Sequence, residues 1–400
     1  MLKRFRWLLW LAFAFVLGFI FSFLVYNGYW YRLIDGLKTL RWYHFFMWLI
    51  LTFLITLIIH ELGHLFAFVF QGVKIRALYL YMLIVYKTKK GWRIKLKPKL
   101  WFLLGGFVVP DLDDIVSDEN YESLVAKFSR SLITAPIVTI ILLILTILLF
   151  LLSIVIGFGS SFIGQLTLFT FYTILLSSLY IKSFKLSNQS FYGDFVAHQK
   201  MKSDPVFQIV QISQYTMFSL NPSKETENYL FQKVKSVILN EKLKSTLFHQ
   251  VILINYIEDV CFQGFEDDPL IREKIMNYPL GSLYHSEQGI TLLYDIAIYY
   301  YHLGWVEKSY QLINKIKTKS SQKIDQKMRD YLEKKHLHIL HIAYDDAYLS
   351  NKAHYVFRMS SLFEDLIDFD EMMKSMHQPL PFRVWESPVN FDDENKNGSR

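Results

Sequence analysis

The residues best suited to chemistry are five consecutive ones, His60, Glu61, Leu62, Gly63 and His64. They lie in a long apolar stretch, residues 45–70, that we expect to be helical. Residues four apart lie on one face of a helix, so the two histidines can bind one metal ion together. The glutamate then projects beside them, where it can take a proton from a water on the metal. Zinc suits this pattern because it binds imidazole nitrogen and can leave one coordination position open.

A purely structural role is the alternative for this motif, with two polar residues satisfied at the end of a helix. Such matches also arise by chance. However, charged and imidazole side chains are costly at the depth of a bilayer, and their presence there points to a function. The sequence therefore predicts metal chemistry within a membrane.

A catalytic zinc site usually has three protein ligands and a water, so the two histidines need a third partner. Asp194 is one candidate, because it follows the last expected membrane span on the same side as the histidine pair. An acidic cluster that begins at Asp111 is a rival closer in sequence, and His198, one helical turn beyond Asp194, is another. The residues alone leave the choice among these three open.

The composition indicates how the chain is divided. Hydrophobic residues make up 52% of the 400 and aromatic residues 17%, and both concentrate in the first half. We therefore expect a membrane domain over residues 1–200, a cytoplasmic helical domain over 201–377 and a disordered tail over 378–400. The net charge of +7 is modest and lies beside apolar spans, so we expect contact with membrane lipid and no nucleic-acid partner. The single cysteine, Cys261, excludes an intrachain disulfide.

Four stretches are apolar and long enough to cross a bilayer, namely residues 7–26, 44–70, 131–156 and 162–181. Residues 71–100 carry nine basic and no acidic side chains, which is typical of a cytoplasmic loop. Residues 27–43 and the glycine-rich turn at 157–164 are then outer segments. This pattern predicts a multi-pass protein of the cell membrane with both termini in the cytoplasm.

Shorter elements are expected between the spans. Residues 73–86 are rich in β-branched and aromatic residues, and residues 92–97 alternate strictly, which predicts a hairpin at the membrane surface. Residues 100–110 include Gly105 and Gly106 and are too short to span, so they form a strand or a re-entrant segment. The acidic run from Asp111 is expected to be a solvated loop, and residues 121–130 a short surface helix.

The second half shows helical periodicity from residue 206 to about 370. One set of residues matches the positions used by a tetratricopeptide helix pair: Ile296, Ala297, Tyr300, Gly304, Ser309 and Ile313. An irregular helical bundle is the other option. The expected fold class is an α-helical multi-pass membrane protein with a small surface β-hairpin or sheet, followed by an all-α soluble domain that has tetratricopeptide-like pairs as one option.

The apolar setting of the histidine motif resembles the site-2-protease family of intramembrane zinc metalloproteases, peptidase family M50. Three further features agree in order and spacing. The segment with Gly105 and Gly106 resembles the family's glycine-containing segment near the active site. Residues 135–139, Ala-Pro-Ile-Val-Thr, are similar to the family's Gly-Pro-x-x-Asn motif, and Asp194 lies where the family carries its metal-binding aspartate.

The resemblance covers roughly residues 44–200 and implies a role for each matching residue. His60, His64 and Asp194 would bind Zn2+, and Glu61 would act as the general base. Substrate contacts would come from Gly105, Gly106 and Thr139. The implied activity is a zinc-dependent intramembrane endopeptidase that cuts single-span membrane proteins or hydrophobic leader-type peptides. The helical domain would select substrate or bind a protein regulator.

This chain departs from the family pattern at several positions. Thr139 stands in place of the asparagine, Ala135 in place of the glycine, and Asp194 follows a glycine instead of preceding one. The pattern is that of a diverged bacterial member. A catalytically inactive membrane scaffold, or a transport or immunity component with a structural or decayed metal motif, is the rival interpretation.

Overall fold

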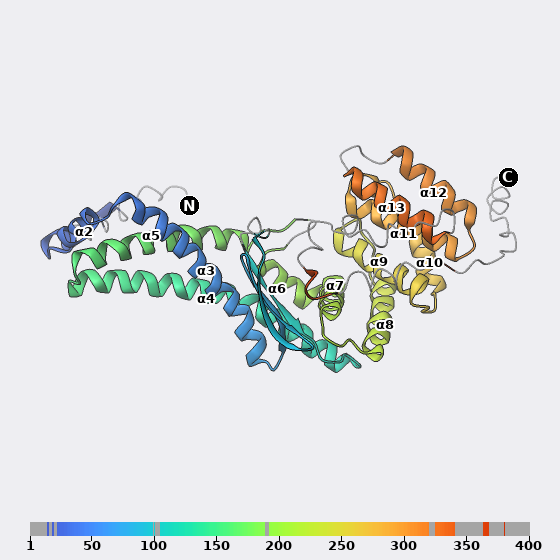
Figure 1. Ribbon diagram of the computed structural model, residues 1–400, viewed down its shortest axis with the longest axis horizontal. Coiled ribbons are helices and arrows are strands. Elements are labelled where there is room, and N and C mark those ends of the chain that lie inside the picture. The colour runs from blue at the N-terminus through green and yellow to red at the C-terminus, as the bar shows by residue number, and fades with distance from the viewer. Residues whose placement is uncertain are drawn as a thin grey trace, which may run out of the picture.

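The computed structural model describes residues 14–15, 18–19, 22–98, 100, 105–188, 192–319, 325–340, 363–367 and 380. Long helices extend towards one end, a small sheet lies at the centre, and shorter helices gather at the other end (Figure 1). The site discussed below lies where these three parts meet.

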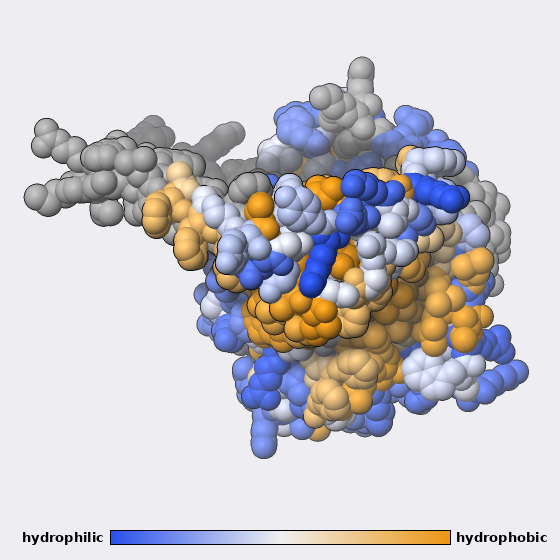
Figure 2. All heavy atoms as spheres, turned by 90° about the vertical axis from the view of Figure 1, so that its left-hand side faces the viewer, coloured by the Kyte–Doolittle hydropathy of each residue, from blue (hydrophilic) through white to orange (hydrophobic). Residues whose placement is uncertain are grey.

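Three helices among the described residues are long and apolar enough to cross a membrane: α3 (Trp42–Phe70), α4 (Asp118–Ile156) and α5 (Ser160–Ser183). Their outward side chains are apolar, as at Ile144, Leu148 and Leu152 of α4, which suits contact with lipid tails. Figure 2, viewed from this end, shows hydrophobic side chains gathered at the centre, with hydrophilic side chains above and below them. Three of the four expected spans are therefore present. The first, residues 7–26, lies largely outside the described residues.

Helix α4 corrects one expectation, because the surface helix over residues 121–130 and the following span are a single helix. It begins at Ser117, whose side chain accepts a hydrogen bond from the backbone N–H of Asn120. Pro136 lies inside this helix and does not end it. No breaker separates the polar first turns from the apolar ones, so the helix simply continues from one into the other.

The segment before α3, which we expect on the outer side, contains a helix, α2 (Tyr29–Lys38). It packs closely on α5, because a Cβ on Gly36 would lie 3.0 Å from the backbone nitrogen of Gly164. Arg32 donates hydrogen bonds from Nη1 to the carbonyls of Ile154 (2.8 Å) and Val155 (3.0 Å). These are unpaired carbonyls of the last turn of α4, so the arginine caps that helix.

The sheet has four antiparallel strands in the order β3-β2-β1-β4: β1 (Lys74–Leu80), β2 (Leu83–Thr88), β3 (Gly91–Leu96) and β4 (Gly106–Asp111). The expected hairpin is confirmed as β2 and β3. The expected strand region over residues 73–86 is divided into two strands by a turn at Tyr81, which has a positive φ of 55°. The glycine-containing stretch forms β4, so the strand alternative is the correct one there.

The acidic run that follows β4 is only partly solvated. Asp111 is 8% exposed and accepts a hydrogen bond from the backbone N–H of Leu220 at 3.0 Å. The expectation of a solvated loop is therefore wrong for Asp111, because it ends a strand that α7 and the segment after it cover. It holds for Asp113, which is 70% exposed and pairs with Lys74.

Eight helices follow the membrane helices among the described residues: α6 (Asp194–Ser203), α7 (Pro205–Met217), α8 (Lys224–Asn240), α9 (Leu247–Phe262), α10 (Pro269–Met276), α11 (Glu287–His302), α12 (Val306–Lys319) and α13 (Gln326–Ile339). One buried cluster joins Phe68 of α3 and Phe128 of α4 to Ile209 of α7 and Ile296 of α11. The helical half therefore packs directly against one end of α3 and one end of α4. These are the ends that we expect on the cytoplasmic side.

Helices α11 and α12 form the pair expected from the tetratricopeptide-like positions. Gly304 makes the turn between them with a φ of 85°, and Ser309 Oγ donates a hydrogen bond to the carbonyl of Ala297 at 2.7 Å. This is one helix pair, and a tetratricopeptide character remains a prediction.

Residues 363–367 pack against the sheet, far from α13 in Figure 1. The ring of Phe363 stacks on Phe218 at 4.3 Å, and Asp365 forms ion pairs with Lys95 and Lys97. The expected disordered tail lies outside the described residues except for Leu380, whose N–H donates to the carbonyl of Ile339.

Candidate active site

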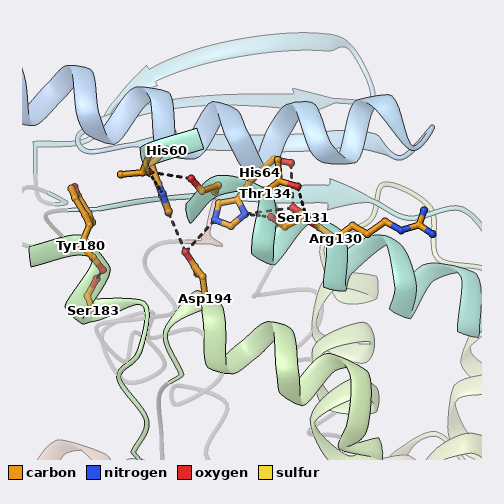
Figure 3. A network of polar contacts seen from close by, with 10 residues as sticks. His60, His64, Arg130, Ser131, Thr134, Tyr180, Ser183 and Asp194 are labelled. Atoms are coloured by element: carbon orange, nitrogen blue, oxygen red, sulfur yellow. Dashed lines mark hydrogen bonds and ion pairs between the residues drawn. The ribbon is translucent and has the colours of Figure 1, made fainter. Parts of the chain in front are cut away.

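Three possible metal ligands converge where α3, α4 and α6 meet (Figure 3). His60 and His64 lie one turn apart on α3, and Asp194 is the first residue of α6. Asp194 Oδ2 lies 3.2 Å from His60 Nε2 and 3.8 Å from His64 Nε2. One ligand atom from each residue lies within 4.8 Å of the others. The structure thus brings together the three residues that the family resemblance indicated.

The other ring nitrogen of each histidine already has a partner. Thr139 Oγ1 lies 3.0 Å from His60 Nδ1 and donates its own hydrogen to the carbonyl of Ala135, so it accepts from the imidazole. The carbonyl of Ser131, which can only accept, lies 3.0 Å from His64 Nδ1. When neutral, each imidazole therefore carries its hydrogen on Nδ1 and directs its Nε2 lone pair towards Asp194.

Close packing of α3 on α4 produces these contacts. A Cβ on Gly63 would lie 2.8 Å from the Cα of Ala135, so only glycine allows the two helices to approach this far. Ser131, Ala135 and Thr139 are four residues apart and share one face of α4. Gly63 therefore packs against Ala135 in the middle of this face. Thr139 and Ser131, on either side of Ala135, contact His60 and His64 respectively.

The position of Gly193 explains why the glycine precedes Asp194 in this chain, whereas in the family pattern the glycine follows the aspartate. A Cβ on Gly193 would lie 2.1 Å from the carbonyl oxygen of Ser183, and its N–H donates to the carbonyl of Leu186 at 2.9 Å. The next backbone contact joins the N–H of Phe195 to the carbonyl of Phe184 at 3.1 Å. These contacts attach the start of α6 to the end of α5 and hold Asp194 opposite the histidines.

Glu61 lies beside the three converging residues and is buried. Its carboxylate accepts a hydrogen bond from the backbone of Gly106, at the start of β4. A Cβ on Gly106 would lie 2.7 Å from Glu61 Cγ and 2.4 Å from the carbonyl oxygen of Tyr79. Within the described residues, Glu61 Oε2 has no hydrogen-bond partner. One carboxylate oxygen is thus available for a reacting group.

The rival third ligands lie elsewhere. His198 Nδ1 contacts the carbonyl of Ser129 at 2.6 Å and its hydroxyl at 3.0 Å, while Asp111 binds the backbone of Leu220.

Thr139 lies behind His60 and orients its ring, and Gly105 accepts a hydrogen bond from the N–H of Tyr81 through its carbonyl. Of the three tentative substrate contacts, Gly106 is the one that lines the cavity described next.

A cavity of about 340 Å³ opens on the converging residues. Besides the three possible ligands and Glu61, its wall includes Gly106, Met201, Gln211 and Tyr215. This volume falls in the range of about 300–1,000 Å³ that is usual for ligand sites. The sequence interpretation missed Gln211 and Tyr215, because they carry no motif and belong to the helical half. Their spacing of four residues was the only available signal.

We expect Thr139→Val to weaken zinc binding about 10–100-fold, which is the usual loss when the partner of a metal-binding histidine is removed. Valine keeps the shape of the side chain but cannot accept from His60 Nδ1. Competition with a zinc-binding dye would measure the change. Thr173→Val is the matched control, because Thr173 is equally buried in α5 and bonds only the carbonyl of Phe169. Unchanged zinc affinity in the Thr139 variant would contradict the assigned orienting role.

Comparison with known proteins agrees with this geometry. A family model described as peptidase family M50 matches residues 48–330, well beyond the region in which the resemblance was first seen. No curated protein and no solved structure gives a significant match. The matched region extends from α3, with its histidine motif, to the start of α13, and it covers more than half of the chain. The chain belongs to peptidase family M50, the site-2-protease family of membrane metalloproteases.

Proposed function

We propose that this protein is a zinc-dependent endopeptidase that hydrolyses peptide bonds of membrane-embedded or leader-type hydrophobic peptides. One observation carries the proposal. Two Nε2 lone pairs and the Asp194 carboxylate converge beside the buried Glu61, at the end of an apolar helix of an M50 family member. Two lone pairs facing a carboxylate repel one another unless a proton or a metal ion lies between them, and two imidazoles with one carboxylate are a donor set that binds metal ions.

The chemistry of the donors favours zinc, which commonly takes two histidines and one carboxylate with an open fourth position. When bound, zinc supplies a Lewis acid that lowers the pKa of water to about 7 and polarises a carbonyl. Glu61 accepts the proton of the attacking water through its free oxygen. It then delivers this proton to the nitrogen of the leaving amine as the peptide bond breaks.

The sheet offers a way to hold an extended substrate at this site. Among the described residues, β4 is an edge strand that pairs with β1 alone, and its first residue, Gly106, lies against Glu61. A peptide that pairs with the free edge of β4 would lie alongside the general base. The absence of a side chain at Gly106 allows this close approach.

An inactive scaffold is less well supported. A decayed site would not need both histidine tautomers set by separate partners, nor an aspartate locked in place by the contacts of Gly193. The three converging side chains, the buried Glu61 and the cavity are all present.

Cleavage of labelled single-span peptides in proteoliposomes tests the proposal. We expect a cut within or next to the apolar segment, loss of cleavage with a zinc chelator, and recovery when zinc is restored. N-methylation of backbone nitrogens near the cut should slow cleavage if the peptide pairs with β4. Stoichiometric zinc without cleavage of any peptide would favour the scaffold, and cleavage indifferent to the chelator would exclude the zinc mechanism.

We also propose that the basic sheet and both termini face the cytoplasm. In a Cys261→Ser background, a cysteine at Lys90 should react with a membrane-impermeant maleimide only from the cytoplasmic side, and one at Ser160 only from outside. Both positions are exposed, so their accessibility depends on topology alone. The reverse labelling pattern would show that the orientation is wrong.

A further inference from the structure

The cavity has a second wall that the proposed mechanism does not use. The proposed mechanism uses His60, Glu61 and His64 of α3, together with Asp194 of α6. Gln211 and Tyr215 of α7 also line this cavity. They are four residues apart, so both side chains project from one face of α7 towards the same space.

Both side chains have unused hydrogen-bonding groups. Within the described part of the chain, neither the Gln211 amide nor the Tyr215 hydroxyl makes a hydrogen bond to protein. Neither group is among the polar atoms that are fully buried without a partner. The neighbouring Gln208 is different, because its amide donates to the carbonyl of Met201 at 2.9 Å. Two polar groups that are free and directed into a reaction cavity are available to a ligand.

The helix that carries them is firmly held. Asp204 caps its start by accepting from the N–H of Phe207 at 3.1 Å, and Ile209 and Ile212 of the same helix are fully buried. The ring of Tyr215 packs against Phe128 at 5.1 Å between ring centres. The hydroxyl is therefore held in a fixed direction instead of sampling many rotamers.

The Tyr215 hydroxyl is protonated at neutral pH, since even the ordinary pKa of tyrosine is about 10. Burial, and then the negative charges of Glu61 and Asp194, raise its pKa to about 12. At neutral pH the residue is thus a hydrogen-bond donor and not a base.

We propose that Tyr215 and Gln211 donate hydrogen bonds to the carbonyl oxygen of the scissile peptide bond and stabilise the negative charge that develops there. This inference rests on the proposed peptidase function. As the water oxygen bonds to the carbonyl carbon and Glu61 takes the proton, the electron pair of the C=O bond moves onto the carbonyl oxygen. The two donors of α7 face that charge. When the C–N bond breaks, the pair returns and the nitrogen takes the proton from Glu61.

This assignment makes α7 part of the catalytic site. The base and ligands come from α3 and α6, and the anion-stabilising donors come from a helix outside the membrane spans. Movement of α7 away from the sheet would then leave the ligands in place and remove the donors.

Tyr215→Phe and Gln211→Leu test the inference in the full-length, zinc-loaded protein. Loss of one such donor typically lowers kcat about 10²–10³-fold, so we expect a fall of that order in kcat for Tyr215→Phe with little change in KM. A phosphinic peptide, which resembles the tetrahedral intermediate, should bind at least about tenfold more weakly. Binding of an ordinary peptide, measured in the non-cleaving Glu61→Gln background, should change little, and zinc content should be unchanged.

Matched controls are Gln214→Leu, on the exposed side of α7, and Tyr310→Phe, on the surface of α12. Normal kcat and normal phosphinic-peptide affinity in both Tyr215→Phe and Gln211→Leu would overturn the inference while leaving the peptidase function intact. Equal weakening of the phosphinic and the ordinary peptide would also overturn it, because that pattern indicates ground-state binding. If the wild-type protein neither cuts peptides nor binds the phosphinic peptide, the proposed function itself fails.

Discussion

Glu61→Gln is expected to abolish peptide cleavage while the protein keeps its zinc. The glutamine has nearly the same shape but cannot accept a proton, and Glu61 is not one of the three residues whose atoms converge as ligands. General-base catalysis contributes about 10²–10⁴-fold to a rate, and we expect a loss at the upper end because the same residue also protonates the leaving nitrogen. Single-turnover cleavage and zinc content should be measured on the same preparation.

The matched control is Glu119→Gln, because Glu119 is exposed in the first turn of α4. This variant should cleave at the wild-type rate. Full activity in the Glu61 variant would exclude the proposed mechanism. Loss of zinc from it would instead make Glu61 a metal ligand.

Asp194→Asn is expected to remove most of the bound zinc and, with it, the activity. The carboxylate is the only negative charge among the three converging residues, and it offsets the cost of holding a cation near the bilayer. The loss of zinc affinity should exceed the roughly 10–100-fold loss expected for an outer partner such as Thr139. Equilibrium dialysis against buffered zinc would measure it.

Two variants serve as controls for that result. Asp113→Asn removes an exposed carboxylate, and His198→Ala removes an imidazole that bonds Ser129, so both should keep zinc. Asp111→Asn should lower thermal stability without releasing zinc, because its carboxylate accepts a hydrogen bond from the part-buried backbone N–H of Leu220. If His198→Ala lost as much zinc as Asp194→Asn, His198 would also be a ligand.

Local patterns were sufficient for part of this site. The spacing of His60 and His64 predicts a shared helix face with Glu61 beside it, and both histidines lie on α3 as expected. Alternating residues likewise predicted the β2–β3 hairpin, because a strand with one apolar face needs a period of two. Family resemblance, and not physics alone, selected Asp194 from its rivals.

Other features depend on contacts between distant segments, which no short pattern encodes. Asp111 lies in an acidic run that reads as solvated, yet Leu220, more than a hundred residues away, binds it. The position of Thr139 in the family-like motif predicts a substrate contact. Close packing of Gly63 on Ala135 instead brings the Thr139 hydroxyl to His60. Tyr215 reaches the cavity only because α7 folds back against α4.

X-ray absorption at the zinc edge of the purified full-length protein tests the central claim most directly. We predict one zinc per chain, with nitrogen and oxygen neighbours at about 2.0–2.2 Å and the multiple-scattering signal of two imidazole rings. In Asp194→Asn, any remaining zinc should have lost its carboxylate neighbour. Sulfur in the first shell, more than two imidazoles, or a wild-type protein that binds no zinc would contradict the account.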